Sequence, residues 1–319
     1  MGLDPECRKY VEKMFDESDA ALAERPNLAA VFDRRWRREF RERTLNAQSR
    51  ADLSFPNSYA KPDQEFMHPE DYQDRLEQGL AILFPKFDEG ERNHFVQRMR
   101  GDGCLSAEEE LLLARGFADT FGANAITFPR VRRDQTRPEF HVSVEGRTIE
   151  IEAKGLLDSK EVQQLNESTA RSGQHHWFSF SSTIGDIGRV RSAVAKKLMS
   201  QTTADGRILV LTQYTLCHMV DEVVPLLRDM ALDPGQFRIP QQQQALAIAY
   251  VLERRIAGVW FNEEVVQRLT LSAGSVRSLR EAIRKSFYPR RDSVFFDETQ
   301  DDGTHRAMIA RRRRAPRGG

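Results

Sequence analysis

The sequence predicts an α/β protein in which helices flank a mixed β-sheet and a helical region precedes it. After residue 100, short apolar segments alternate with stretches of helical periodicity, which is typical of a mixed α/β core rather than a barrel or sandwich. Residues 138–154 hold two segments in which apolar and polar side chains alternate, as in half-buried strands. Residues 1–100 instead carry apolar side chains at helical spacing.

The first hundred residues are expected to form a helical N-terminal region. Its helices are predicted at residues 6–23, 27–46, 69–84 and 88–100. A looser, proline-containing stretch separates the second helix from the third. We expect this region to dock a partner protein or to form a homodimer.

Residues 34–43 contain six arginines, with Trp36 and Phe40 at four-residue spacing. A basic helix of this kind can bind a phosphate backbone while its aromatic rings stack on bases. The same pattern is typical of an amphipathic helix whose aromatic residues pack inward and whose arginines face water. Glu39 and Glu42 interrupt the positive charge and favour the second interpretation.

A further helix is predicted at residues 106–122. Ser106 is suitable as its N-cap, and Glu109 three residues later would complete a capping box. Gly122 is suitable as its C-cap.

Glu110 shares the apolar stripe of this helix. Apolar residues follow it at helical spacing: Leu113, Ala114, Phe117 and Phe121. Glu108 lies instead on the stripe of Arg115 and Asp119, so we expect it to be more solvated. Glu110 is therefore the first candidate for a functional carboxylate and Glu108 the second. Alternatively, Glu108, Glu109 and Glu110 simply favour the positive end of the helix dipole.

Residues 138–154 predict a β-hairpin with one apolar and one polar face. The apolar face holds Phe140, Val142, Val144, Ile149, Ile151 and Ala153. The polar face holds Glu139, His141, Ser143, Glu150, Glu152 and Lys154. The connection runs through Gly146, which can take the positive φ that a tight turn needs.

The polar face gathers carboxylates and a lysine on a rigid platform. Carboxylates a few ångströms apart repel each other unless one is protonated or a cation lies between them. Such oxygen ligands suit Mg²⁺, which lowers the pKa of a bound water and polarises a phosphoryl oxygen. The ammonium of Lys154 would neutralise charge that builds up on a phosphate. These groups predict a hydrolytic phosphodiesterase, with His141 supporting the site rather than binding the metal.

This arrangement resembles the PD-(D/E)XK nuclease superfamily, whose fold is restriction-endonuclease-like. Pro138 and Glu139 match the element that opens one strand in that family, and Glu152 and Lys154 match its Asp/Glu-x-Lys element. Glu139 stands where that family usually has Asp. The resemblance covers residues 106–212.

The resemblance implies a metal-dependent nuclease that hydrolyses phosphodiester bonds of DNA and leaves a 5′-phosphate. Glu139 and Glu152 would bind Mg²⁺ or Mn²⁺, and Glu110 on the preceding helix would reach the same metal. Lys154 would position the attacking water and stabilise the transition state. Many such nucleases act as dimers, because cutting two strands needs two active sites. The implied activity is endonucleolytic and serves defence or repair.

The remainder of the chain alternates strands and helices. Strands are predicted at residues 177–181, 208–212, 246–252 and 256–261, and helices at residues 186–201, 219–231, 265–271 and 275–287. One of these helices carries four basic residues away from its apolar stripe: Arg189, Arg191, Lys196 and Lys197. They either contact a substrate backbone or form an ordinary solvated face.

Composition and motifs restrict the partners, cofactors and cellular compartment that we expect. The 48 basic and 48 acidic side chains give a net charge of zero, which argues against bulk attraction to nucleic acid and leaves local patches. Cys7, Cys104 and Cys217 are widely spaced, form no metal motif and suggest a reducing compartment. The sequence has no phosphate-binding loop, so no nucleotide cofactor is expected. No apolar segment approaches the ~20 residues of a membrane span, so we expect a cytoplasmic protein without membrane contact.

Three regions are therefore expected: a helical region at residues 1–100, a nuclease-like α/β domain at residues 101–290, and a basic tail at residues 291–319. The arginines of the tail could add non-specific affinity for nucleic acid. The neutral net charge and Glu139 in place of Asp favour one alternative, a non-catalytic module that binds nucleic acid or protein within a larger assembly.

Overall fold

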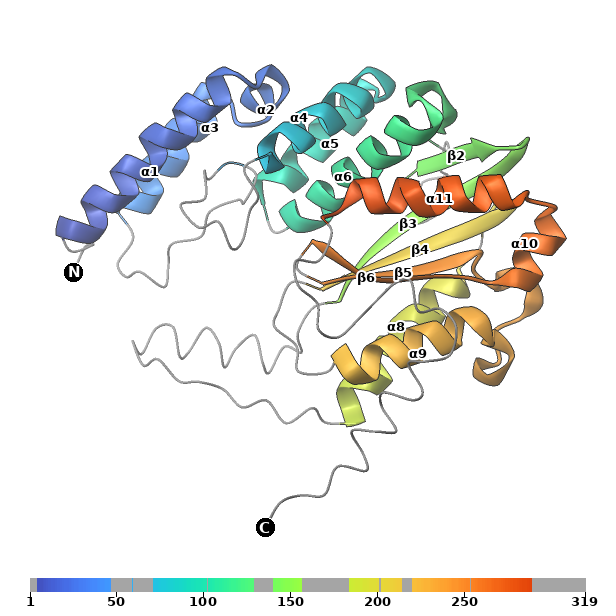
Figure 1. The fold of residues 1–319 in the computed structure, drawn as a ribbon. Coiled ribbons are helices and arrows are strands. Elements are labelled where there is room, and N and C mark those ends of the chain that lie inside the picture. The colour runs from blue at the N-terminus through green and yellow to red at the C-terminus, as the bar shows by residue number, and fades with distance from the viewer. Residues whose placement is uncertain are drawn as a thin grey trace, which may run out of the picture.

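A mixed β-sheet lies at the centre of the structure (Figure 1). The computed structural model describes residues 5–46, 59, 71–101, 103–128, 140–156, 184–200, 202–213, 220–252 and 254–288. Within these residues six strands lie side by side in chain order: β1 (Ile126–Thr127), β2 (Phe140–Val144), β3 (Arg147–Leu156), β4 (Gly206–Gln213), β5 (Ala247–Leu252) and β6 (Arg255–Phe261). The predicted α/β class, with a mixed sheet flanked by helices, is therefore confirmed.

Strand direction divides the sheet into three parts. β1, β2 and β3 are antiparallel, β3, β4 and β5 are parallel, and β6 is antiparallel to β5. Parallel neighbours require crossover connections, which here contain helices. β4, β5 and β6 confirm three predicted strands, whereas the strand predicted at residues 177–181 lies outside the described residues.

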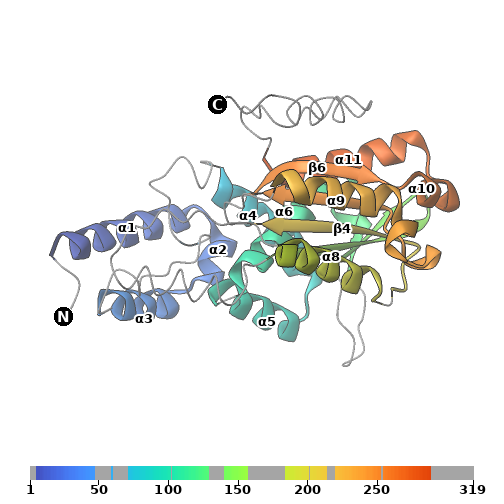
Figure 2. The ribbon, with the colours of Figure 1, turned by 90° about the horizontal axis from the view of Figure 1, so that it is seen from below.

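Helices cover both faces of the sheet, as Figures 1 and 2 show. α6 (Cys104–Phe121) and α11 (Ala273–Ser286) pack on one face, and α8 (Ile184–Leu198) and α9 (Val220–Leu232) pack on the other. Each face buries its own hydrophobic cluster. The short helix α10 (Glu263–Leu269) connects β6 to α11.

The N-terminal helices extend the layer that contains α6. They are α1 (Pro5–Ala23), α2 (Pro26–Val31), α3 (Arg34–Leu45), α4 (Tyr72–Leu83) and α5 (Glu89–Arg100). One hydrophobic cluster runs from Leu28 of α2 through Leu80 of α4 and Leu111 of α6 to the sheet. Short 3₁₀ turns occur at η2 (Phe84–Lys86), η3 (Ala123–Ala125), η4 (Pro234–Phe237) and η5 (Gln241–Gln243). In the part of the chain described here, no helix combines the length and the apolar character that crossing a bilayer requires.

The single helix predicted at residues 27–46 is wrong, because the chain forms α2 and α3 there. Asp33 caps α3, and its Oδ1 accepts a hydrogen bond from the backbone N–H of Trp36 at 2.9 Å. Arg100 adds an ion pair to the same carboxylate. The hydrogen bond from Trp36 and the contact with Arg100 lower the pKa of Asp33. Aspartate is a favoured N-cap residue, so the chain restarts a helix at this point.

The predicted start of α6 is also wrong. The helix begins at Cys104, its N-cap is Gly103, and Ser106 lies inside the first turn. The hydroxyl of Ser106 instead accepts a hydrogen bond from Nη2 of Arg98 at 3.2 Å. The predicted C-cap is confirmed, because Gly122 ends the helix with a φ of 84°.

The β2–β3 hairpin has the predicted faces. Every residue predicted on the apolar face packs in the cluster beneath α6: Phe140, Val142, Val144, Ile149, Ile151 and Ala153. The turn consists of Glu145 and Gly146, with positive φ values of 50° and 75° that suit a two-residue hairpin loop. The carboxylate of Glu145 accepts hydrogen bonds from the hydroxyl and the backbone N–H of Ser272, at 2.7 and 3.0 Å. These bonds attach the turn to the start of α11 and lower the pKa of Glu145.

The aromatic residues of the arginine-rich helix α3 face inward. The rings of Trp36 and Phe40 stack with centroids 4.7 Å apart. Arg37 forms an ion pair with Asp19 of α1 at 3.0 Å. Both contacts favour the interpretation of α3 as an amphipathic helix over that of a nucleic-acid grip.

Candidate functional site

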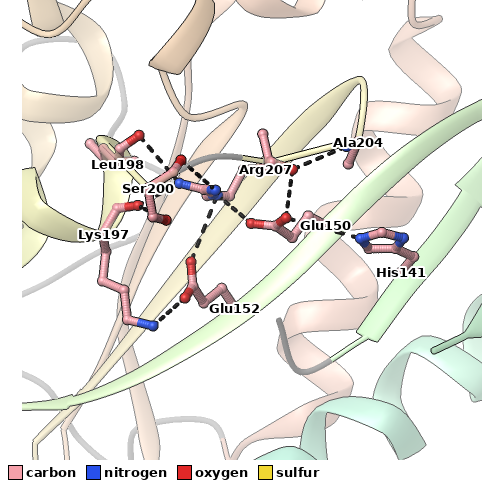
Figure 3. A network of polar contacts seen from close by, with 9 residues as sticks. His141, Glu150, Glu152, Lys197, Leu198, Ser200, Ala204 and Arg207 are labelled. Carbon is pink, nitrogen blue, oxygen red and sulfur yellow. Dashed lines mark hydrogen bonds and ion pairs between the residues drawn. The ribbon is translucent and has the colours of Figure 1, made fainter. Parts of the chain in front are cut away.

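Glu150 and Glu152, on the polar face of the β2–β3 hairpin, point toward Arg207 and Lys197 (Figure 3). Glu150 and Glu152 alternate along β3 with residues that pack beneath α6, so they project from the opposite face. Both are almost fully buried, with 3% and 4% of their surface exposed. They lie beside Arg207 of β4 and Lys197 near the end of α8. We refer to these four residues as the charge cluster.

Both carboxylate oxygens of Glu150 accept hydrogen bonds. Its Oε1 accepts a hydrogen bond from Nε of Arg207, which pairs with it across β3 and β4. Its Oε2 accepts a hydrogen bond from the hydroxyl of Thr202 and lies 4.0 Å from Nε2 of His141. Because both oxygens have hydrogen-bond partners, Glu150 is the less suitable metal ligand of the two glutamates.

Glu152 has a different environment. Its Oε1 accepts a hydrogen bond from the ammonium of Lys197. Its Oε2 is buried, has no hydrogen-bond partner among the described residues and lies 3.7 Å from Nε of Arg207. A buried carboxylate oxygen without a hydrogen bond is energetically costly, and a cation would offset that cost. The guanidinium of Arg207 partly offsets that cost, and the role of Glu152 as a metal ligand stays a prediction.

Arg207 fixes the end of α8 to the sheet. Its guanidinium donates hydrogen bonds to the backbone oxygens of Lys197, Leu198 and Ser200 as well as to Glu150. Carbonyl groups at a helix C-terminus carry partial negative charge, so a buried guanidinium is stabilised there. The two carboxylates and two cations of the charge cluster cancel in formal charge.

His141 is buried beside the charge cluster. Burial lowers its pKa from the usual value of 6.5, and the carboxylate of Glu150 partly opposes this effect. Nε2 of His141 has no hydrogen-bond partner among the residues that the structure describes. The imidazole is therefore neutral at neutral pH, which suits a supporting role better than that of a cation for phosphate.

Lys154 extends the polar face beyond Glu152. It lies two residues further along β3, pairs across the sheet with Leu211 and is partly buried. Within the described ranges, no hydrogen bond or ion pair engages its ammonium. Lys154 is thus available to bind an anion close to Glu152.

Glu110 is buried in α6, as predicted. α6 covers the face of the hairpin opposite to the charge cluster, because it packs on Phe140 and Ile151. Oε2 of Glu110 forms an ion pair with Nη1 of Arg98 on α5 at 2.9 Å. This contact directs Glu110 toward the N-terminal helices, and its approach to Glu152 stays a prediction.

The predicted solvation of Glu108 is wrong, because this residue is fully buried. Its Oε2 accepts hydrogen bonds from the hydroxyl of Tyr72 at 2.6 Å and from Nη2 of Arg254 at 2.8 Å. Burial, together with the charge of Glu108, raises the pKa of Cys104 to about 11. Glu108 is therefore a structural residue, and the thiol beside it stays protonated.

Glu139 lies outside the described residues, directly before β2. Phe140, the first residue of β2, pairs with Ile151, the residue before Glu152. No group of three or more His, Cys, Asp or Glu side chains within the described ranges is arranged to hold a metal ion. The predicted metal ligands Glu110, Glu139 and Glu152 include a residue beyond those ranges, so this set stays a prediction.

The basic residues of α8 lie in different environments. Lys197 binds Glu152, Arg191 lies over the ring of Phe237 at 5.2 Å, and Lys196 is exposed. The solvated-face interpretation therefore holds for Lys196, and Lys197 belongs to the candidate site.

Sequence reasoning did not connect Lys197 and Arg207 with the hairpin. Arg207 directly precedes the apolar strand predicted at residues 208–212. A lone arginine entering a buried strand is a usable signal, because a buried guanidinium needs a carboxylate partner. Glu150 on the neighbouring strand is that partner.

Comparison of the chain with protein-family models, with curated proteins and with solved structures gives no match. The charge cluster, together with Lys154 and the strand order around it, therefore carries the functional inference.

Proposed function

We propose that the chain is a metal-dependent nuclease that hydrolyses phosphodiester bonds of DNA. The observation that carries this proposal is the arrangement of Glu152 and Lys154 on one face of β3. Glu152 offers a buried oxygen without a hydrogen bond, and Lys154 offers an ammonium that no described carboxylate neutralises. An oxygen ligand for a metal and a cation near the phosphate are the groups that metal-assisted phosphodiester hydrolysis uses.

The order of elements around the site supports the proposal. α6, with its buried glutamates, precedes β1 and the β2–β3 hairpin, and Glu139 directly precedes the first arm of that hairpin. Glu152 and Lys154 lie in the second half of β3. β3 and β4 are parallel, so their carboxyl ends meet at the edge where open α/β sheets bind ligands.

In this proposal Glu152 and Glu139 hold Mg²⁺ or Mn²⁺, with Glu110 as a further ligand. When bound, the ion supplies a water of lowered pKa and polarises a phosphoryl oxygen. Lys154 orients the attacking water and neutralises the charge that builds up on the phosphate. Arg207 binds both Glu150 of β3 and a backbone oxygen at the end of α8, and these contacts hold the neighbouring Glu152 in place.

Cleavage of plasmid DNA in the presence of Mg²⁺ or Mn²⁺ tests the proposal. Glu152→Gln and Lys154→Met remove one charge each at nearly constant side-chain size. Each should lower the cleavage rate by about 10²-fold or more, the usual effect of losing one transition-state contact. Chelation of the metal with EDTA should abolish cleavage.

Two exposed residues provide matched controls. Glu281→Gln on α11 and Lys196→Met on α8 change the same charges away from the site and should leave the cleavage rate unchanged. Equal cleavage by the wild type, Glu152→Gln and Lys154→Met would contradict the proposed nuclease.

One observation favours a second candidate, a non-catalytic module that binds nucleic acid or protein. Glu152 and Glu110 form ion pairs with Lys197 and Arg98, so the protein's own cations already neutralise them. A thermal melt with Mn²⁺ separates the two candidates. A nuclease site should gain about 2.7 kcal/mol at a Mn²⁺ concentration of about 100 times Kd, whereas the module should show no shift.

A further inference from the structure

We propose that Lys154 and Gln213 form an anion site that binds a backbone phosphate of nucleic acid without a metal ion, with Tyr250 as a positioning residue for Gln213. This inference rests on the proposed function, because it concerns how the same edge of the sheet binds its substrate. The site lies in the carboxyl-terminal halves of the three parallel strands β3, β4 and β5, which Figure 1 shows side by side.

The strand register places the three residues on one face of the sheet. Lys154 pairs with Leu211 of β4, and Leu211 pairs with Tyr250 of β5. Leu211 and Tyr250 belong to the hydrophobic cluster beneath α8 and α9, and Gln213 follows Leu211 by two residues, so it projects from the same face. The strand spacing and rise place the Cα atoms of Lys154 and Gln213 about 8 Å apart, so both side chains can reach one phosphate.

Tyr250 fixes the orientation of the Gln213 amide. The hydroxyl of Tyr250 donates a hydrogen bond to Oε1 of Gln213 at 2.6 Å, and both residues are buried. Because the amide oxygen is held by Tyr250, the amide nitrogen is directed away from that hydroxyl. Among the described residues, no group accepts a hydrogen bond from Nε2 of Gln213. The pair therefore leaves one oriented N–H donor for a ligand.

The balance of charge favours an anion at this position. The two carboxylates and two cations of the charge cluster cancel, and Lys154 adds one positive charge. This ammonium is partly buried and has no ion-pair partner within the described ranges, so an anion would stabilise it. Lysine and glutamine side chains are common donors to phosphate oxygens of a nucleic-acid backbone. One ammonium and one amide donor match a phosphodiester group, which carries a single negative charge and two free oxygens.

Binding of a labelled DNA duplex to the full chain, measured by fluorescence anisotropy in EDTA, tests the site in the absence of metal. Lys154→Met should lower the affinity about tenfold and reduce the slope of log K against log salt by about 0.9, the value for one phosphate contact. Gln213→Leu removes a neutral donor and should lower the affinity about tenfold while leaving that slope unchanged. The matched controls Lys9→Met on α1 and Gln267→Leu on α10 change exposed residues and should bind DNA as the wild type does.

Gln213→Glu guards against loss of folding. The glutamate has the same shape and can still accept the hydrogen bond from Tyr250, but it replaces the amide donor by a negative charge. Its affinity for DNA should therefore be lower than that of Gln213→Leu.

Tyr250→Phe tests the positioning role. It should weaken DNA binding severalfold in the wild type and have no effect in the Gln213→Leu background, because the amide that Tyr250 orients is then absent. Equal losses in the two backgrounds would assign Tyr250 a purely structural role and overturn this part of the inference.

Inorganic phosphate provides a second arm of the test. At constant ionic strength and at the concentration of the DNA, it should not displace the duplex; displacement would identify free phosphate as the ligand and overturn the assignment to a nucleic-acid backbone. Wild-type affinity of Gln213→Leu and Gln213→Glu, or absence of DNA binding in EDTA, would overturn the anion site but leave metal-dependent cleavage standing. The expected binding without any cleavage in Mg²⁺ or Mn²⁺ would support the anion site and overturn the nuclease.

Discussion

At the scale of single residues, His141 responds to the environment that the charge cluster creates. Burial lowers its pKa below 6.5, so the folded protein binds this proton less readily than the unfolded chain does. The stability associated with neutral His141 is fully present above the unfolded pKa. It is lost as the pH falls through the lower pKa of the folded state.

We therefore expect the free energy of unfolding to decrease as the pH falls from about 7 to about 5, and His141→Gln to reduce that decrease. Urea unfolding at a series of pH values measures the effect. His94→Gln, at an exposed histidine of α5, should keep the wild-type profile. Parallel pH profiles for the wild type and His141→Gln would assign the acid sensitivity to another group.

The hairpin shows which residue-level features could be predicted. The period-two geometry of a strand depends on the local chain alone, so the faces of β2 and β3 followed from alternation. The partners of the carboxylates depend on the path of the chain instead. Lys197 lies 45 positions from Glu152, and Arg207 lies 57 positions from Glu150. No local pattern links residues so far apart.

At the scale of secondary-structure elements, the contact between α6 and α11 depends on Gly116. A Cβ atom at this position would lie 2.5 Å from the carbonyl oxygen of Ala282 and would also meet Oγ of Ser286. Both residues are buried in α11, so the two helices would have to move apart.

Gly116→Ala should therefore destabilise the protein by about 1–3 kcal/mol, although alanine favours helices. Gly188→Ala provides the opposite case, because a Cβ at this exposed position of α8 meets nothing within 4 Å. It should stabilise the protein by about 0.5–1 kcal/mol through helix propensity. Chemical denaturation measures both changes, and stabilisation by both substitutions would contradict the close packing of α6 and α11.

Helix boundaries were harder to predict than the helices themselves. The apolar periodicity continues across Asp33. The carboxylate of Asp33 nevertheless caps α3 by accepting a hydrogen bond from the backbone N–H of Trp36, and it also binds Arg100. Ser106 has the chemistry of an N-cap, but Arg98 uses its hydroxyl and the helix starts earlier. In both places a tertiary contact with an arginine of α5 accompanies the difference from the predicted boundary.

At the scale of the whole molecule, the buried pair of Glu108 and Arg254 links distant parts of the chain. Arg254 lies beside the start of β6, donates to Glu108 at 2.8 Å and lies over the ring of Tyr72 at 4.2 Å. The pair spans 146 positions, so the helical pattern alone placed Glu108 on a solvated stripe. α4, α6 and the region around β6 are thereby joined through one carboxylate.

Arg254→Met should lower the free energy of unfolding by about 3–5 kcal/mol, because it removes a charged hydrogen-bond donor from the buried carboxylate of Glu108. The double variant Glu108→Gln/Arg254→Met should recover part of this loss. Arg277→Met, at an exposed arginine of α11, serves as the control in urea unfolding. A single variant as stable as the wild type would show that this pair contributes little to joining these elements.

The spatial order of the strands, which repeats their order along the chain, affects how the protein can be made. Among the described residues, each strand finds its neighbour already synthesised, so no gap between these six strands waits for a later segment. The sheet can therefore grow at one edge while the ribosome is still translating, with β6 as the last of the described strands to be added.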